Sequence, residues 1–320
     1  MTLLERLQAR GHRRIGTLRS GFRFVTCGGE AVPAKDAQRC KSLVLPPAWT
    51  DVRVAPSSSS HLQAIGKDKA GRWQYRYSTK FRERQDRHKF GKVVSFAESL
   101  PKMRTAIRRD LARRGLGREK VMACILKILS TSFIRPGSQR YAEENGSYGI
   151  ATLRRKHTKV HGDVVEFSFP GKSGQDQSAS VRDRRVARVV RALLKLPGHE
   201  VFKFLDDDGR VVDVTRKHIN LYIKDVMGER FSAKDFRTWG GTLVTASTLA
   251  RSSGRHKLDR QTRKKRVVDA VKKTAEVLGN TPAVSRSSYI APSVLWNFDK
   301  GKTAAESSEK AVVTLLKRKG

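Results

Sequence analysis

The hydrophobic pattern of this chain changes its period near residue 90, and that change limits the folds that the chain can adopt. Before it, apolar and polar residues alternate in short runs, as expected for strands with one buried face. These runs occupy residues 21–27, 41–55 and 61–78. From Val93 onward the apolar residues recur at helical spacing. We therefore predict an α+β protein, with a small β-rich domain in residues 1–92 and a larger, mainly α-helical domain in residues 93–320.

A second group of strands interrupts the helical domain and predicts a small antiparallel sheet within it. We expect strands in residues 148–155, 159–169 and 177–183. A Gly-rich turn, PGKSGQD, joins the last two strands and places Lys172 at its tip. Helices are then expected in residues 184–196, 216–228, 234–250 and 260–279, followed by a loop in residues 280–292.

The net charge narrows the class of partner. The chain has 67 Lys and Arg against 30 Asp and Glu, a formal charge of +37. Such an excess repels itself in a compact fold and is typical of a protein that binds a polyanion, so DNA or RNA is the expected partner. A membrane surface is the competing partner, but the sequence contains neither an apolar stretch of spanning length nor a lipidation motif.

Few residues suggest a metal or an oxidising compartment. The three cysteines, Cys27, Cys40 and Cys124, form no CxxC pair, and we expect reduced thiols and no metal site. The first residues lack the apolar core of a signal peptide, which favours a cytoplasmic protein, nucleoid-associated in a bacterium. The acidic run at 206–208, followed by Gly209, lacks the other ligands of a calcium loop and predicts a turn.

Four segments place Arg, Lys or Tyr beside a turn or a helix start, where side chains can converge on a ligand. They read FIRPGSQRY, FPGKSGQD, SAKDFRTWGGT and LGNTPAVSRSSYIAP. Taken singly, each Arg or Lys is better explained as a solvated charge, and Tyr289 as a half-buried aromatic residue. The GKS triplet is not a P-loop, because Glu166 stands where that motif requires Gly, so no ATP site is predicted.

In their order and local contexts these segments resemble the type IB topoisomerases, particularly the compact poxvirus-like and bacterial branch. The resemblance extends to the N-terminal run GRWQYRYS. It implies a catalytic set made of Arg135, Lys172, Lys234, Arg237, Asn280 and Tyr289. It also implies that the two domains form a clamp around duplex DNA, and that the enzyme is a monomer needing no ATP, metal or small-molecule cofactor.

The implied chemistry is transfer of a DNA phosphoryl group to Tyr289, which leaves a 3′-phosphotyrosine. The guanidinium groups of Arg135 and Arg237 would stabilise the phenolate and the phosphate charge. Lys172 would protonate the 5′-oxygen that leaves, with Lys234 as an accessory donor. Many relatives have His where this chain has Asn280, and an amide can donate a hydrogen bond but cannot carry charge or exchange a proton.

The resemblance also implies contacts with DNA outside the catalytic set. Tyr75 and Tyr77 alternate on one strand and so face the same side, which suits either a core stripe or contact with the duplex. We expect DNA contacts from Arg72, Tyr75, Arg76, Tyr77 and Tyr141.

Two rival functions remain open to the sequence. A tyrosine recombinase shares the chemistry but normally has His where this chain has Lys234, and the RTWGG run also favours a topoisomerase. A DNA-compacting protein would need only the positive charge and would leave Tyr289 without a role.

Overall fold

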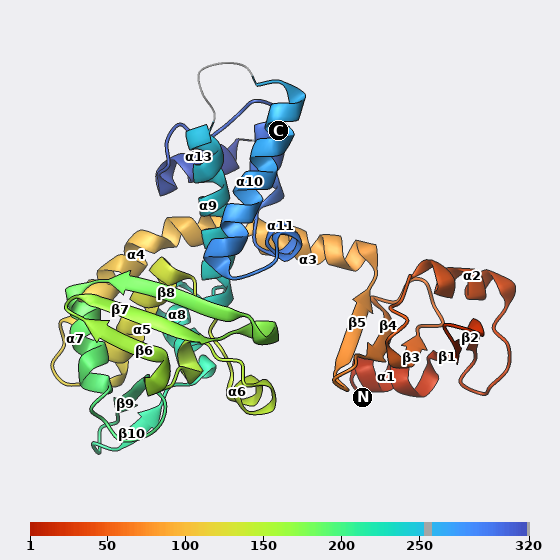
Figure 1. Ribbon diagram of the computed structural model, residues 1–320, viewed down its shortest axis with the longest axis horizontal. Coiled ribbons are helices and arrows are strands. Elements are labelled where there is room, and N and C mark those ends of the chain that lie inside the picture. The colour runs from red at the N-terminus through yellow and green to blue at the C-terminus, as the bar shows by residue number, and fades with distance from the viewer. Residues whose placement is uncertain (253–257, 319–320) are drawn as a thin grey trace. The chain divides into compact units, whose positions relative to one another are not determined.

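The computed structural model describes residues 1–252 and 258–318, and the chain divides into two compact units, Met1–Lys89 and Phe90–Gly320 (Figure 1). Each unit contains its own apolar clusters. Among the helices described, none combines the length and the apolar composition needed to cross a membrane.

The first unit is a five-stranded antiparallel sheet with helices against it. Its strands are β1 (His12–Thr17), β2 (Gly21–Val25), β3 (Thr50–Val54), β4 (Leu62–Lys67) and β5 (Trp73–Tyr77), in the order β2-β1-β3-β4-β5. Leu7 of helix α1 (Leu3–Arg10) packs with Leu62 and Ile65. Cys40 of helix α2 (Ala34–Ser42) packs in a second cluster with Val54 and Ala64. Side chains of β4 therefore enter two separate apolar clusters.

The sequence predicted the strands of this unit better than its helices. The expected strand over residues 41–55 is confirmed only for β3, because Pro46 and Pro47 have no amide hydrogen to give to a sheet. The preceding residues form α2 instead, and helix α3 (Thr79–Gly91) follows β5. The run over residues 61–78 folds as the two strands β4 and β5 with a turn between them, in which the Asp68 carboxylate accepts bonds from the amides of Ala70 and Arg72, each at 3.0 Å.

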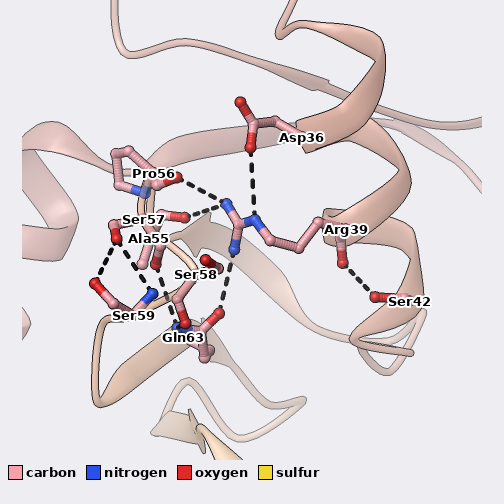
Figure 2. Close-up of polar contacts among 9 residues, drawn as sticks. All are labelled: Asp36, Arg39, Ser42, Ala55, Pro56, Ser57, Ser58, Ser59 and Gln63. Atoms are coloured by element: carbon pink, nitrogen blue, oxygen red, sulfur yellow. Dashed lines mark hydrogen bonds and ion pairs between the residues drawn. The ribbon is translucent and has the colours of Figure 1, made fainter.

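Two polar side chains, the half-buried Arg39 and the buried Gln63, organise the serine loop between β3 and β4 (Figure 2). Arg39 of α2 donates to the Ala55 carbonyl at 2.6 Å and to the Gln63 Oε1 atom at 3.2 Å. Gln63 is 4% exposed, and its Nε2 atom donates to the Ser60 carbonyl at 2.6 Å. The loop carbonyls are thus satisfied from inside the unit, which fixes α2 against the sheet.

The second unit is mainly helical. Its helices are α4 (Val93–Leu111), α5 (Arg118–Ser132), α6 (Gln139–Asn145), α7 (Arg184–Leu193), α8 (Arg216–Met227), α9 (Ala233–Ser252), α10 (Arg260–Leu278), α11 (Pro282–Ser288), α12 (Pro292–Asp299) and α13 (Glu309–Lys317). Helix α5 is buried on nearly every side and packs against α4, α7, α8 and α9. Its apolar residues lack the one-sided period of a surface helix, which is typical of a central helix.

A three-stranded antiparallel sheet lies beside these helices, in the order β6 (Thr158–His161), β7 (Val164–Pro170) and β8 (Asp176–Arg182) (Figure 1). The strand predicted in residues 177–183 is confirmed as β8. The single strand predicted in residues 159–169 is two paired strands, β6 and β7, because the chain turns at Gly162, which lies in the left-handed region at φ 51°. The 3-10 turn η3 (Lys172–Gly174) joins β7 to β8, so Lys172 lies at the tip of this hairpin. The acidic run at 206–208 forms the predicted turn, between β9 (Lys203–Leu205) and β10 (Val211–Asp213).

The strand predicted over residues 148–155 is wrong. This segment instead contains two 3-10 turns, η1 (Ile150–Thr152) and η2 (Arg155–His157). The reason is that its amides serve another segment, since the amide of Ile150 donates to the Arg135 carbonyl at 2.9 Å and that of Ala151 to the Pro136 carbonyl at 3.0 Å. The predicted loop over 280–292 is also corrected, because α11 lies within it.

Candidate active site

Tyr289 directly follows α11 as its C-cap. Two hydrogen bonds between α9 and the segment around Tyr289 fix the backbone there. The Tyr289 amide donates to the Ser285 carbonyl at 3.0 Å, and the Thr242 hydroxyl of α9 lies 3.3 Å from the Tyr289 carbonyl. The same hydroxyl accepts from the Ala291 amide at 3.1 Å. The Tyr289 side chain is half-buried. A phenol anchored in this way can face a ligand with little loss of side-chain freedom.

Arg237 lies on α9, before Thr242 in the same helix, and is only 3% exposed. Its guanidinium carbon lies 4.9 Å from the centre of the Tyr289 ring. Two of its nitrogens donate to backbone carbonyls, Nη1 to Phe133 at 2.5 Å and Nη2 to Leu278 at 2.8 Å. Burial and the neighbouring charge of Arg135 lower the pKa of Arg237 to about 10, which still leaves it cationic at neutral pH.

Arg135 approaches the same place from the segment after α5. Its Nη2 atom donates to the Gly279 carbonyl at 3.0 Å and also to Asn280 Oδ1. Because a guanidinium can only donate, this contact orients the Asn280 amide with its oxygen toward Arg135. The Asn280 Nδ2 atom is buried and has no hydrogen-bond partner in the described part of the chain. A free amide donor therefore remains beside the arginine.

Glycines of α9 allow the close packing of this cluster. A β-carbon on Gly240 would lie 2.5 Å from the Phe133 ring, and one on Gly241 would lie 2.7 Å from the Tyr289 carbonyl. Phe133 ends α5 in the left-handed region, at φ 53°, and its carbonyl is the one that holds Arg237. The sequence shows Gly240 and Gly241 only as part of the RTWGG run and gave no prediction that they admit Phe133 and Tyr289.

Several opposing effects set the acidity of Tyr289. Burial by itself raises the pKa of the phenol, but the charge of Arg237, with smaller contributions from Arg135 and Lys234, outweighs it. The pKa of Tyr289 therefore lies below its usual value near 10. The cluster favours the phenolate, which is the nucleophilic form.

The two lysines of the predicted set are placed differently. Lys234 is exposed at the start of α9, near enough to Tyr289 to affect its pKa. Lys172 is exposed at the hairpin tip. Within the described part of the chain, it has no hydrogen bond to either arginine or to Tyr289. The structure thus brings together Arg135, Lys234, Arg237, Asn280 and Tyr289, and leaves the Lys172 side chain free.

The predicted DNA contacts outside this cluster lie on exposed elements. In the first unit Tyr75 is 43% exposed, and its ring stacks on that of Tyr77 with centroids 6.3 Å apart, so both rings do share one side of β5. Arg72 pairs with Asp68 at 2.9 Å, whereas Arg76 is half-buried. In the second unit Tyr141 is 57% exposed on α6.

Comparisons with known proteins assign this chain to a family. Residues 78–313 match the model described as "Eukaryotic DNA topoisomerase I, catalytic core", and residues 21–68 match "Bacterial DNA topoisomerase IB, N-terminal domain". The DNA topoisomerase 1B of Acanthamoeba polyphaga mimivirus is 36% identical over 280 residues, which cover 85% of this chain and 83% of the viral protein. The chain belongs to the type IB DNA topoisomerases. It is an ATP-independent enzyme, and its substrate is DNA.

More distant relatives agree with this family. The DNA topoisomerase 1B of vaccinia virus, strain Western Reserve, is 24% identical over 234 residues, 72% of this topoisomerase and 70% of the viral one. Among solved structures, the XerH site-specific recombinase bound to its difH substrate matches 64% of this chain and 52% of its own. That match has a TM-score of 0.37 at 13% identity, too low to support the recombinase alternative.

Proposed function

We propose that this topoisomerase relaxes supercoiled DNA with Tyr289 as its nucleophile. The observation that supports this role is the contact between the Tyr289 ring and the buried guanidinium of Arg237, with Arg135 beside them. The Tyr289 phenol would lose its proton to solvent, and its oxygen would attack a backbone phosphorus as the bond from phosphorus to the 5′-oxygen breaks. The products are a 3′-phosphotyrosine and a free 5′-hydroxyl.

The two arginines would stabilise the transferring group. Each guanidinium still has donors that are not used by the carbonyls of Phe133, Leu278 and Gly279, and a planar fork matches two phosphate oxygens. The unpartnered Asn280 amide would donate to a third position, as a hydrogen-bond donor and not as an acid. Positioning and charge stabilisation are the main contributions a protein can make to phosphoryl transfer.

Lys172 would supply the proton that the leaving 5′-oxygen takes up, with Lys234 as an accessory donor. An alkoxide is a poor leaving group, and a lysine at a hairpin tip can reach it as the bond breaks. In the reverse step the 5′-hydroxyl returns this proton and attacks the phosphotyrosine, which restores the strand. Between the steps the downstream duplex can turn and release supercoils of either sign.

The remaining expectations extend this mechanism to the whole enzyme. We infer that residues 1–92 are a DNA-binding domain and residues 93–320 the catalytic domain, which close around the duplex as a clamp. Tyr75, Tyr77, Tyr141, Arg72 and Arg76 would contact the DNA. We expect a cytoplasmic monomer that requires no metal or small-molecule cofactor, because protein cations supply the charge at the phosphate.

Relaxation of supercoiled plasmid in EDTA, without nucleotide, tests this proposal. The wild-type enzyme should relax both positive and negative supercoils under these conditions. Tyr289→Phe keeps the ring and removes one oxygen, so it should bind DNA as the wild type does and relax none of it. A requirement for magnesium would contradict the mechanism, and full activity of Tyr289→Phe would exclude the nucleophile.

A further inference from the structure

Gln177 of β8 lies between the Lys172 hairpin and the loop that carries Asn280. Its side chain is half-buried and contacts a glycine at each end. A β-carbon on Gly171 would lie 2.4 Å from Gln177 Cγ, and one on Gly279 would lie 1.6 Å from Gln177 Oε1. Only glycine at both positions leaves room for this side chain.

Both glycines adjoin residues of the proposed catalytic set. Gly171 directly precedes Lys172, and Gly279 directly precedes Asn280. Gly279 ends α10 in the left-handed region, at φ 57°, and its carbonyl accepts from Arg135. A single side chain thus spans from the base of the hairpin to the backbone that holds the arginine.

Two further hydrogen bonds of the hairpin end lie at its base. The Gly171 amide donates to the Gln175 carbonyl at 2.8 Å, and the Ser147 hydroxyl donates to the Gly171 carbonyl at 3.1 Å. These bonds close the turn and join it to the segment after α6. Neither joins it to the loop at Asn280, and the Gln177 Nε2 atom donates to the Asp176 carbonyl at 3.1 Å on its own strand. The contact between Gln177 and Gly279 therefore joins the hairpin to that loop.

We propose that Gln177 is a positioning residue for the proton donor. Its side chain acts as a spacer that holds the Lys172 hairpin against the Asn280 loop, so that the Lys172 ammonium meets the 5′-oxygen when phosphate is bound. This inference rests on the proposed role of Lys172 as the acid. The alternative is that Gln177 only fills space. A change at Gln177 would then alter the cleavage rates of the oxygen and sulfur substrates equally, or alter neither.

A substrate with sulfur in place of the leaving 5′-oxygen separates these cases, because a thiolate leaves without being protonated. Gln177→Ala should slow single-turnover cleavage of the oxygen substrate by about tenfold to a hundredfold, the cost expected for a misplaced catalytic group. Its cleavage of the sulfur substrate should equal that of the wild type. Gln177→Met keeps the length of the spacer and should stay within about threefold of the wild type on both substrates.

Two further variants serve as controls. Gln175→Ala removes an exposed glutamine from the same hairpin and should leave both rates unchanged. Lys172→Ala should lose cleavage of the oxygen substrate and regain it with sulfur. The melting temperature and DNA affinity of Gln177→Ala should match those of the wild type, which would exclude unfolding as the cause.

The outcomes distinguish this inference from the mechanism on which it rests. If sulfur rescues Lys172→Ala but not Gln177→Ala, the positioning role is wrong and the acid stands. An unchanged rate for Gln177→Ala on oxygen would likewise overturn the inference. If sulfur fails to rescue Lys172→Ala, the acid itself is misassigned and the inference falls with it.

Discussion

At the scale of single residues, the candidate site is a phenol beside two arginines whose charges are oriented by backbone carbonyls. Arg237 is bound by the carbonyls of Phe133 and Leu278, and Arg135 by that of Gly279. These carbonyls offset part of the cost of burying like charges close together. They also fix the direction of each guanidinium before DNA binds, so little reorganisation is needed during the reaction.

Arg135→Ala and Arg237→Ala should each slow cleavage and religation by about a hundredfold to a thousandfold, the range for loss of a transition-state donor. Duplex affinity should change little, because the lost stabilisation arises in the transition state. Single-turnover kinetics on a short duplex, with filter binding, measure both quantities. Arg188→Ala, which removes an exposed arginine of α7, is the control. Equal losses in affinity and rate would show that the arginines only position the DNA.

The sequence predicts the charged members of this site but not the groups that hold them. Arg135, Arg237 and Tyr289 stand in local motifs, so a resemblance can find them. The backbone carbonyls and the Gln177 spacer are contacts between distant segments, and side-chain identity alone carries no signal for them. Gly279 was a possible signal for the end of α10 beside Asn280, since a helix that ends in the left-handed region favours glycine there.

At the scale of elements, the approach of α9 to α5 and α11 depends on two glycines within a helix. Glycine normally lowers the stability of a helix by about 1 kcal/mol relative to alanine. Here the missing side chain at Gly240 accommodates the Phe133 ring, and at Gly241 the Tyr289 backbone. Their cost in helix propensity is therefore offset by packing that sets the position of the site.

Gly240→Ala should destabilise the protein by about 1 to 3 kcal/mol, because the added methyl group overpacks against Phe133. It should also reduce cleavage, since the Phe133 carbonyl orients Arg237. Gly91→Ala is the matched control, a helical glycine of α3 with open space around it, and should be neutral or slightly stabilising. Urea unfolding measures both variants. A Gly240→Ala variant as stable as the wild type would mean that Phe133 moves without cost.

Asp110 of α4 joins that helix to α8 and gives a second test at this scale. It is fully buried and accepts from the Tyr222 hydroxyl at 2.6 Å and from Arg109 and Arg113. Bonding to Arg109 holds the pKa of this carboxyl well below its usual range. A lowered folded-state pKa contributes stability above the unfolded pKa of about 3.9, and this stability is lost as the pH falls below it.

Asp110→Ala should therefore lower the free energy of unfolding by about 1 to 3 kcal/mol at neutral pH, as for a buried group that loses its partner. The difference from the wild type should shrink as the pH falls below the unfolded pKa of about 3.9, because the unfolded wild-type chain then takes up a proton that the folded carboxylate does not. Unfolding in urea across this range measures it, with the exposed Asp207→Ala as the control. A constant difference at all pH values would contradict the ionic role of Asp110.

At this scale, the sequence predicts elements with local hydrogen bonds better than segments whose backbone bonds to a distant part of the chain. The β7–β8 hairpin could be predicted because alternation and a Gly-rich turn are local. Residues 148–155 have the composition of a strand, but the amides of Ile150 and Ala151 donate to the Arg135 segment, a long-range pairing that local pattern does not encode. The helix α11 was missed because it is short, although Thr281 at the N-cap and Pro282 at the first helical position are a local signal for a helix start.

At the scale of the whole molecule, the charge of +37 dominates binding to DNA. Each Lys or Arg that neutralises a phosphate releases counterions, so affinity should fall steeply with salt. Fluorescence anisotropy of a labelled duplex should show a loss of about a thousandfold or more between about 50 and 200 mM salt. Tyr289→Phe should have the same slope, because the variant keeps every lysine and arginine that displaces counterions from phosphates. A flat response would mean that the positive charge serves another partner.

The central claim is that Tyr289 forms the covalent bond to DNA, and trapping that bond tests it most directly. Denaturing the wild-type enzyme during relaxation should leave protein attached to a 3′ phosphate. Protease digestion and mass spectrometry should then place the nucleotide on Tyr289, within the peptide that contains SRSSYIAP. Tyr289→Phe should give no adduct. An adduct on Ser285, Ser287, Ser288 or another tyrosine would contradict the account.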